Sequence, residues 1–250
     1  MIINTEGIVL RQIKYGDSSS ILKIYTRLRG VQSFMVRGMR KVGSKQKSAL
    51  FFPLTELDIT AHIEKNQLHY LKEVKLAYPY QSLYMDIRKS GIAVFLSEML
   101  NKCLNEGESD NKLFDYIWYS LREFDASKEN FNADFHLYFL FDLSAFLGFY
   151  PRREENDKSK LFDMREGCFC VEPPSHLDYL NENMASLFRC FLLWKEQQEK
   201  GMLEQGNERP QLNLSQRQQV LRCIVQYYRI QLPIIGEVKS MEILQEVFHG

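Results

Sequence analysis

A dense cluster of basic side chains marks the first part of this 250-residue chain. Ten lysine and arginine residues lie between positions 11 and 47, where Asp17 is the single acid. Such a density suits a phosphate backbone, which is bound through charge and counterion release and needs no base-specific pocket. An ordinary solvated surface is the alternative. The candidate DNA-binding residues are Arg11, Lys14, Arg27, Arg29, Arg37, Arg40, Lys41, Lys45 and Lys47.

Aromatic residues are interleaved with these cations, and they supply the second chemistry of nucleic-acid binding. An aromatic ring that stacks on a base contributes about 1–3 kcal/mol. A strand aromatic is more often packed in a core, so we expect most of these rings to be buried and Tyr15, beside a turn, to be the exception. The aromatics in question are Tyr15, Tyr25, Phe34, Phe51 and Phe52.

Catalytic and metal chemistry have little support. The motifs GxxxxGK[ST], GxGxxG, GxSxG and HExxH are absent, and the five histidines are scattered. Cys168 and Cys170 are the best metal candidates, with His176 as a third ligand, but one intervening residue is a poor zinc spacing and no second pair follows. We therefore expect no metal and no cofactor.

Five short β segments precede residue 75, over residues 7–15, 20–25, 31–36, 54–60 and 68–74. Turn residues separate the first three: Tyr15-Gly16-Asp17-Ser18, then Arg29-Gly30. This pattern predicts a small Greek-key barrel of the oligonucleotide-binding (OB) type. The stretch 37–50, RGMRKVGSKQKSAL, is too polar and too basic for a strand, so it predicts a basic loop on the barrel.

The periodicity changes from 2 to 3.6 after Tyr78, which predicts helices over residues 87–104, 113–124, 131–149, 181–195, 215–230 and 240–248. Ser215 is the expected N-cap of the fifth helix. We predict an α+β protein with an OB-fold domain at 1–78 and an α-helical domain at 79–250. An irregular excursion near 151–176 would carry two brief strands around residues 165–167.

The net charge of zero hides an asymmetry. Residues 1–80 carry 13 basic and 6 acidic side chains, whereas the rest of the chain has a balance of −7. A basic first part indicates a polyanionic partner, and the acidic remainder suits protein partners. No apolar run is long enough for a transmembrane helix, and no signal peptide is evident, so a cytoplasmic, nucleoid-associated protein is expected.

A set of short segments occurs in order along nearly the whole chain. They are Gly7-Ile8-Val9-Leu10, Tyr15-Gly16-Asp17-Ser18-Ser19, Tyr25-Thr26, Gly30, Val36-Arg37-Gly38, Leu147-Gly148-Phe149-Tyr150-Pro151, Tyr227-Tyr228-Arg229, Leu232-Pro233, Lys239-Ser240 and Leu244. In their order and spacing these segments resemble the RecO family of bacterial recombination mediators.

The resemblance implies an OB fold, a helical domain and a mediator that binds single- and double-stranded DNA and anneals complementary strands. It also implies contact with RecR and with the acidic tail of single-strand binding protein, and thereby help in loading RecA. Many family members carry a four-cysteine zinc module after the segment that matches Gly148–Pro151. Here residues 152–167 contain no cysteine, so zinc is not expected.

Three alternatives stay open at this stage. Tyr227, Tyr228 and Arg229 are candidates for binding the tail of single-strand binding protein, but a tyrosine pair on a helix suits a core equally well. The barrel could bind a protein partner, with DNA contact incidental. An enzyme would need carboxylates such as Glu98, Asp134 and Asp142, which show no useful spacing beyond helical registers.

Overall fold

The computed structural model of the chain describes residues 1–15, 19–37, 50–64, 68–127, 132–153, 158–199 and 212–249. The chain divides into two compact units, residues 1–132 with 237–250 and residues 133–236. The predicted boundary between residues 78 and 79 stays a prediction, because helices packed on a barrel do not test whether the barrel folds alone.

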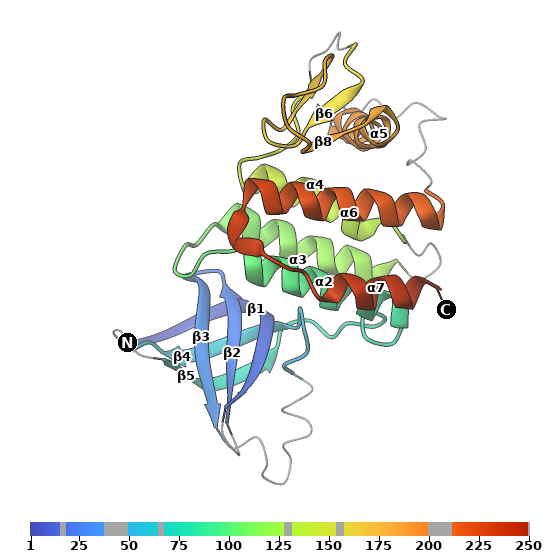
Figure 1. Cartoon of the computed structure of the whole chain (residues 1–250). Coiled ribbons are helices and arrows are strands. Elements are labelled where there is room, and N and C mark those ends of the chain that lie inside the picture. The colour runs from blue at the N-terminus through green and yellow to red at the C-terminus, as the bar shows by residue number, and fades with distance from the viewer. Residues whose placement is uncertain are drawn as a thin grey trace. The chain divides into compact units, whose positions relative to one another are not determined.

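Five strands form the closed barrel that the turn pattern predicted (Figure 1). They are β1 (Ile2–Tyr15), β2 (Ser19–Thr26), β3 (Gly30–Arg37), β4 (Glu56–His62) and β5 (His69–Leu76). Their order around the barrel is β1-β2-β3-β5-β4. Each pair of neighbours is antiparallel except β3 and β5, which pair in parallel at two positions. The predicted OB fold is confirmed.

The barrel interior is filled by apolar side chains that alternate along the strands, as a period of two requires. The core residues are Val9, Leu22, Ile24, Phe34, Phe51, Leu57, Ile59 and Ala61. β1 begins at Ile2, five residues before its predicted start, because its first residues pair with β4. Asn4 and Glu6 lie opposite Thr60 and Asp58 on the outer face, whereas Thr5 lies opposite the core residue Ile59.

Gly30 fixes the turn between β2 and β3. Its φ of 62° lies in the left-handed region, and a Cβ atom placed there would lie 1.9 Å from the backbone oxygen of Glu108. Only glycine satisfies both constraints. The turn therefore lies directly against the segment between the next two helices.

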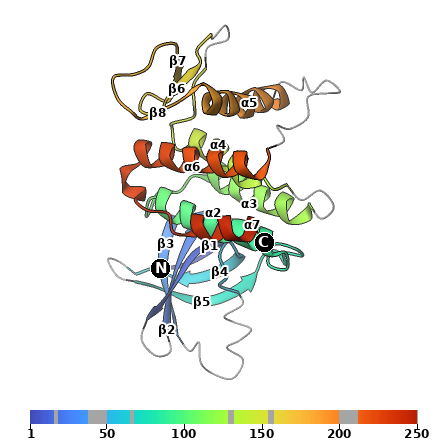
Figure 2. The ribbon, with the colours of Figure 1, turned by 45° about the vertical axis from the view of Figure 1, so that its right-hand side comes forward.

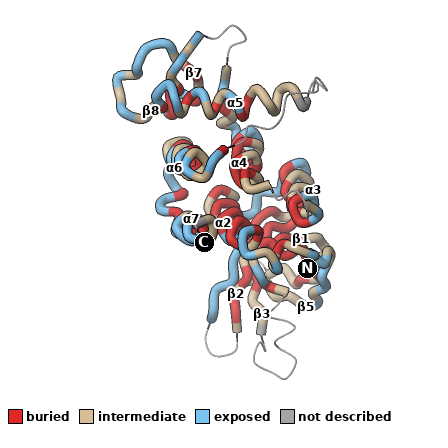
Figure 3. The backbone as a smooth tube through the Cα atoms, turned by 90° about the vertical axis from the view of Figure 1, so that its right-hand side faces the viewer, coloured by how far each residue is buried: buried red, intermediate tan, exposed pale blue. Residues whose placement is uncertain are grey.

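Three helices belong to the same unit as the barrel: α2 (Ile87–Cys103), α3 (Asn111–Ala126) and α7 (Ser240–His249). Asp86 and Asp110 cap the first two. The Glu98 carboxylate on α2 accepts hydrogen bonds from the Ser240 backbone N–H and hydroxyl at 2.7 and 2.6 Å, so it caps α7. α2 lies beside both α7 and β1 and is buried along most of its length (Figures 2 and 3).

The second unit contains α4 (Phe135–Phe146), α5 (Glu182–Glu199), α6 (Leu214–Gln231) and a short 3₁₀ helix, η1 (Pro233–Ile235). A three-stranded sheet in the order β7-β6-β8 forms the predicted excursion, with β6 (Leu161–Asp163), β7 (Cys168–Cys170) and β8 (Tyr179–Leu180). The first two strands were expected and the third was not.

Ser215 is not the N-cap of α6. Asn213 is, and its side chain accepts from the Gln216 backbone N–H while the Gln216 side chain accepts from the Asn213 N–H. This reciprocal capping box satisfies two backbone donors, whereas a serine N-cap two residues later would leave the Gln216 side chain without that role. The predicted helix 131–149 is also shorter as observed, with Asp134 at its N-cap.

Candidate nucleic-acid interface

The outer face of β1, β2 and β3 presents the exposed part of the predicted interface. Directly opposite residues on neighbouring strands share a face. The strand registers form three rows on this face, Tyr15–Ser19–Arg37, Ile13–Ile21–Met35 and Arg11–Lys23–Ser33. Tyr15 is 55% exposed and Arg11 is exposed. An aromatic ring and a cation are thus presented on one sheet face.

The half of this face nearest the β2–β3 turn is covered. Tyr25 packs against Phe114 with ring centroids 5.6 Å apart and donates a hydrogen bond to the Asp110 carbonyl. Lys23 forms a 3.0 Å ion pair with Glu106. The open half is therefore the end that carries Tyr15, Ile13 and Arg11.

The predicted DNA ligand Arg27 is committed to the fold. Its guanidinium donates to Glu6 at 2.5 Å and to Asp115 at 2.6 Å, and it lies 4.4 Å from the centroid of the Phe114 ring. A phosphate would have to displace two carboxylates to reach it. The local sequence carries no signal for this role, because Asp115 lies 88 residues further along the chain.

The other predicted ligands have different surroundings. Arg11 and Lys14 are exposed and form no ion pair with any residue that the structure describes. Arg29 is half-buried. The pKa of His69 is lowered mainly by burial of its ring, and the positive charge of Arg29 lowers it further. Arg37 ends β3, and nothing is described of its side chain. The remaining predicted ligands, which lie outside the described residues, are Arg40, Lys41, Lys45 and Lys47.

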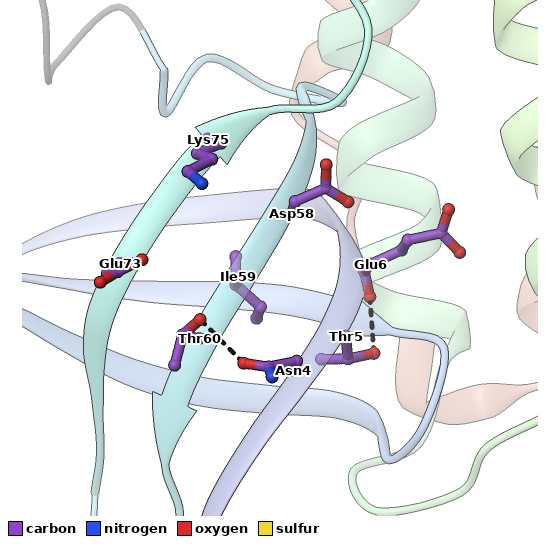
Figure 4. Close-up of a pocket in the computed structure, with 8 residues that line it drawn as sticks. All are labelled: Asn4, Thr5, Glu6, Asp58, Ile59, Thr60, Glu73 and Lys75. Atoms are coloured by element: carbon purple, nitrogen blue, oxygen red, sulfur yellow. Dashed lines mark hydrogen bonds between the residues drawn. The ribbon is translucent and has the colours of Figure 1, made fainter.

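The opposite face of the barrel is acidic. A hollow of about 330 Å³ on β1, β4 and β5 is lined by Glu6, Asp58 and Glu73 together with Lys75 (Figure 4). Thr60 donates a hydrogen bond to Asn4 across its floor at 2.8 Å. Glu6 is already paired with Arg27, and the remaining carboxylates, Asp58 and Glu73, outnumber the one ammonium of Lys75, so the hollow repels a phosphodiester. Of the described barrel surfaces, this hollow therefore suits DNA least.

The described barrel is close to charge balance. Seven cations and five carboxylates within residues 1–80 have described side chains, so most of the +7 excess belongs to residues outside the description. Most of the 37–47 segment, which was predicted to be the densest phosphate-binding region, also lies outside the described residues. The sheet face around Arg11 is the part of the predicted interface whose geometry is known.

Burial separates the aromatics as expected. Tyr25, Phe34 and Phe51 are buried, and Tyr15 is exposed. Phe52 is 52% exposed, although Tyr15 was the one ring expected to lie outside the core. The residue pattern around Phe51 and Phe52 carries no signal that separates the buried ring from the exposed one.

The candidate partner residues of α6 are mostly inside the second unit. Tyr227 and Tyr228 are only 2% and 1% exposed. Their hydroxyls donate to the backbone oxygens of Phe149 at 2.6 Å and Leu140 at 2.5 Å. Burial raises the pKa of Tyr227 above its ordinary value. Both rings therefore pack in the core, and of the three candidates only Arg229 is exposed.

The carboxylates considered for an enzyme have structural partners. Glu98 caps α7, Asp134 forms a 2.5 Å ion pair with Arg217, and Asp142 pairs with Lys195. Burial, together with the charge of Arg217, lowers the pKa of His136 to about 3, so this imidazole is neutral near pH 7. Each of the three carboxylates is therefore held by a contact that stabilises the fold.

Cys168 and Cys170 lie on β7, where they pair with Asp163 and Leu161 of β6. His176 approaches Asp163 at 3.4 Å. Within the part of the chain that is described, no three histidine, cysteine or acidic side chains are grouped as metal ligands. No helix within that same part is both long and apolar enough to cross a membrane.

Two family models match the chain: Recombination protein O N terminal over residues 1–80 and Recombination protein O C terminal over residues 84–240. Curated proteins named DNA repair protein RecO are similar over their full length. The one from Phocaeicola vulgatus is 35% identical over 252 residues, covering 99% of this chain and 100% of the relative. Those from Bacteroides fragilis and Flavobacterium psychrophilum are 36% and 35% identical over 250 residues, with the same coverage.

Proposed function

Because the chain belongs to the recombination protein O family, a family of DNA repair proteins, we propose that it acts as a mediator of homologous recombination. In this role it binds single- and double-stranded DNA and anneals complementary strands. With RecR, it helps to load RecA onto strands coated by single-strand binding protein, whose acidic tail it contacts. None of these steps needs a nucleotide cofactor or a catalytic residue.

The observation that carries the DNA-binding part is the contrast between the two faces of the barrel. Arg11 and Tyr15 stand on the open half of the β1–β2–β3 face, while Glu6, Asp58 and Glu73 surround the hollow on the other side. A polyanion is attracted to the first face and repelled by the second, so the strand has one favoured side. The basic segment 37–47 begins at the last residue of β3 and adds five cations to the sequence of this domain.

Annealing follows from this mode of binding. Cations that hold phosphates neutralise the strand and raise its local concentration, while bases that are not enclosed remain free to pair with a second strand. The proposed ligands are Arg11 on the outer face of β1, Lys14 near the exposed end of the same strand, and Arg37, Arg40, Lys41, Lys45 and Lys47 in the basic segment.

The test is single-strand affinity as a function of salt. A variant with alanine at the five basic positions of 37–47 should bind more weakly, and its salt slope should fall by roughly 0.7 for each phosphate that the protein no longer neutralises. Arg11→Gln with Lys14→Gln should act in the same direction. Lys75→Gln is the matched control, since Lys75 is an exposed barrel cation that lines the acidic hollow. Unchanged affinity and slope in the first two variants, or equal decreases in all three, would contradict the proposal.

A second candidate is an adaptor whose barrel binds a protein and touches DNA only incidentally. The acidic hollow favours it, because Asp58 and Glu73 suit a basic protein surface better than DNA. Binding of purified RecR to an Asp58→Asn, Glu73→Gln variant separates the two. If the variant loses this complex but still binds and anneals DNA, the hollow serves the adaptor role. If annealing is lost together with the complex, protein binding is the main activity of the barrel.

A further inference from the structure

A cavity of about 600 Å³ lies beside β1, next to the proposed DNA-binding face and entirely within the first unit. It is bounded by β1 at Leu10–Gln12, by the turn at Phe51–Pro53, by α2 and by the residues just before α7. Ligand pockets in proteins measure about 300–1,000 Å³, so its size suits a compact organic group.

An irregularity in β1 creates one wall of this cavity. The register between β1 and β2 shifts between Val9 and Arg11, so Leu10 is the extra residue of a β-bulge. The pairing of β1 with β4 ends at Ile8, whereas its pairing with β2 continues to Tyr15. Residues 11–15 therefore have β4 on neither edge, and Arg11 and Gln12 line the cavity.

The floor of the cavity is apolar and one aromatic ring borders it. Leu10 and Phe51 are buried at 3% and 4% exposure, while Phe52 is half-exposed and Val94 lies at the rim. Phe52 is steadied by Tyr84, with ring centroids 5.7 Å apart. A flat ligand can thus stack on a ring that is already held in place.

The polar groups of the cavity suit a nucleotide. The Asn101 side-chain oxygen is buried and has no hydrogen-bond partner among the described residues, although a carboxamide can offer both a donor and an acceptor to a base edge. The side chains of Arg11 and Lys239 are exposed and lack an ion-pair partner in the described chain. Both cations line the cavity, where they can bind the phosphates that flank a base.

The carboxylates of the cavity only partly oppose an anion. Glu98 is occupied by the N–H groups of Lys239 and Ser240 at 3.2 and 2.7 Å, and by Lys102 at 3.7 Å. Burial acts to raise the pKa of Glu98, but these hydrogen bonds outweigh it and lower the pKa. Glu98 is therefore an anion whose charge is already compensated, and Glu237 is the other carboxylate of the lining, beside the cations Arg11 and Lys239.

We propose that this cavity is a base-binding subsite for single-stranded DNA. It takes one unpaired base against Phe52, with the base edge hydrogen-bonded to Asn101 and the neighbouring phosphates bound by Arg11 and Lys239. The inference rests on the proposed DNA-binding function and adds a place where one base is held out of pairing. Such a contact fixes a single strand on the barrel, and double-stranded DNA cannot make it because its bases are stacked inside the duplex.

The test uses a thymidine oligonucleotide and the same oligonucleotide with abasic sites, which keeps the phosphates and removes the bases. Phe52→Ala should weaken binding of the thymidine strand by about tenfold and should leave the abasic strand and duplex DNA unaffected. Asn101→Leu should have the same selectivity. The matched controls are Tyr119→Ala and Asn105→Leu, which remove an exposed ring and an exposed carboxamide outside the cavity.

Cross-linking gives an independent readout on the unmodified protein. A strand containing 5-iododeoxyuridine, irradiated in complex with the full chain and digested, should yield a cross-link at Phe51–Pro53 that Phe52→Ala removes. If the strand binds with the expected salt dependence but cross-links elsewhere, and both variants bind like the wild type, the subsite is wrong and the proposed function stands. If the full chain binds neither strand, the proposed function fails and the subsite fails with it.

Discussion

Arg122 on α3 donates a hydrogen bond from Nε to the Glu56 carboxylate on β4 at 2.8 Å, and the Glu56 side chain is completely buried. The Tyr80 hydroxyl donates to the other carboxylate oxygen at 2.9 Å. A helix is thus joined to the barrel through an ionisable group that is shielded from water. The stability of this junction depends on how the carboxyl group titrates.

Glu56 makes the fold pH-dependent. Burial raises its pKa to about 7 from an ordinary 4.5, although Arg122 and Tyr80 oppose the rise. Between these two values the unfolded chain releases the proton and the folded chain keeps it. The contribution of Glu56 to the free energy of unfolding is therefore full below pH 4.5 and is lost as the pH rises to 7, by on the order of 1–3 kcal/mol.

Urea unfolding of the wild type and of Glu56→Gln at pH 4.5, 5.5 and 7 checks this. Other groups cancel in the difference, and Gln keeps a hydrogen-bonding oxygen for Arg122 without titrating. We expect the wild type to lose stability relative to the variant as the pH rises. A difference that is constant over this range would show that Glu56 titrates normally.

Arg27 and Arg11 are predicted to have separable roles. Arg27→Met removes two charge-assisted hydrogen bonds from a half-buried guanidinium and should lower the free energy of unfolding by about 1–3 kcal/mol. Arg11→Met should change stability by less than about 0.5 kcal/mol but should weaken single-strand binding. Urea unfolding and DNA titration of both variants test the pair. If Arg27→Met instead weakened DNA binding without lowering stability, Arg27 would belong to the DNA interface that the sequence predicted.

Lys89 on α2 should stabilise the C-terminal end of α3. Its ammonium is buried and donates to the backbone oxygens of Phe124, Asp125 and Ser127 at 2.7, 3.1 and 2.9 Å. Lys89→Met keeps the length of the side chain but leaves these carbonyls without that donor, which should cost about 2–3 kcal/mol. Lys112→Met, at an exposed position in the first turn of α3, is the control and should cost under about 0.5 kcal/mol. Similar midpoints in urea for the two variants would refute this role.

Gly30 and Gly107 both have positive φ, but replacement by alanine should destabilise the fold more at Gly30 than at Gly107. Gly30→Ala places a Cβ atom against the Glu108 backbone and should cost more than about 2 kcal/mol. Gly107→Ala meets nothing within 4 Å and should cost about 1 kcal/mol, from backbone strain alone. Thermal unfolding of the two variants measures the difference. Equal costs would mean that the turn moves away from Glu108 easily.

The sequence alone determined those features of the structure that depend on residues close together in the chain. Alternating apolar residues and turn glycines predicted five strands and the OB barrel, and the position of Tyr15 beside a turn predicted its exposure. The N-cap of α6 was misplaced at Ser215 because two polar residues compete within three positions, and only the reciprocal bonds between Asn213 and Gln216 decide between them.

The tertiary structure decided which charges and rings are available. Asp115 turns Arg27 from a candidate DNA ligand into part of the fold. The strand registers bring Glu6, Asp58 and Lys75 into one row, which makes one barrel face acidic although residues 1–80 are basic in total. The cavity near Phe52 and Asn101 is lined in part by Lys239, which comes from the far end of the chain. Strand pairing and long-range packing set these contacts, and a local residue pattern carries no information about which distant segment will pack against it.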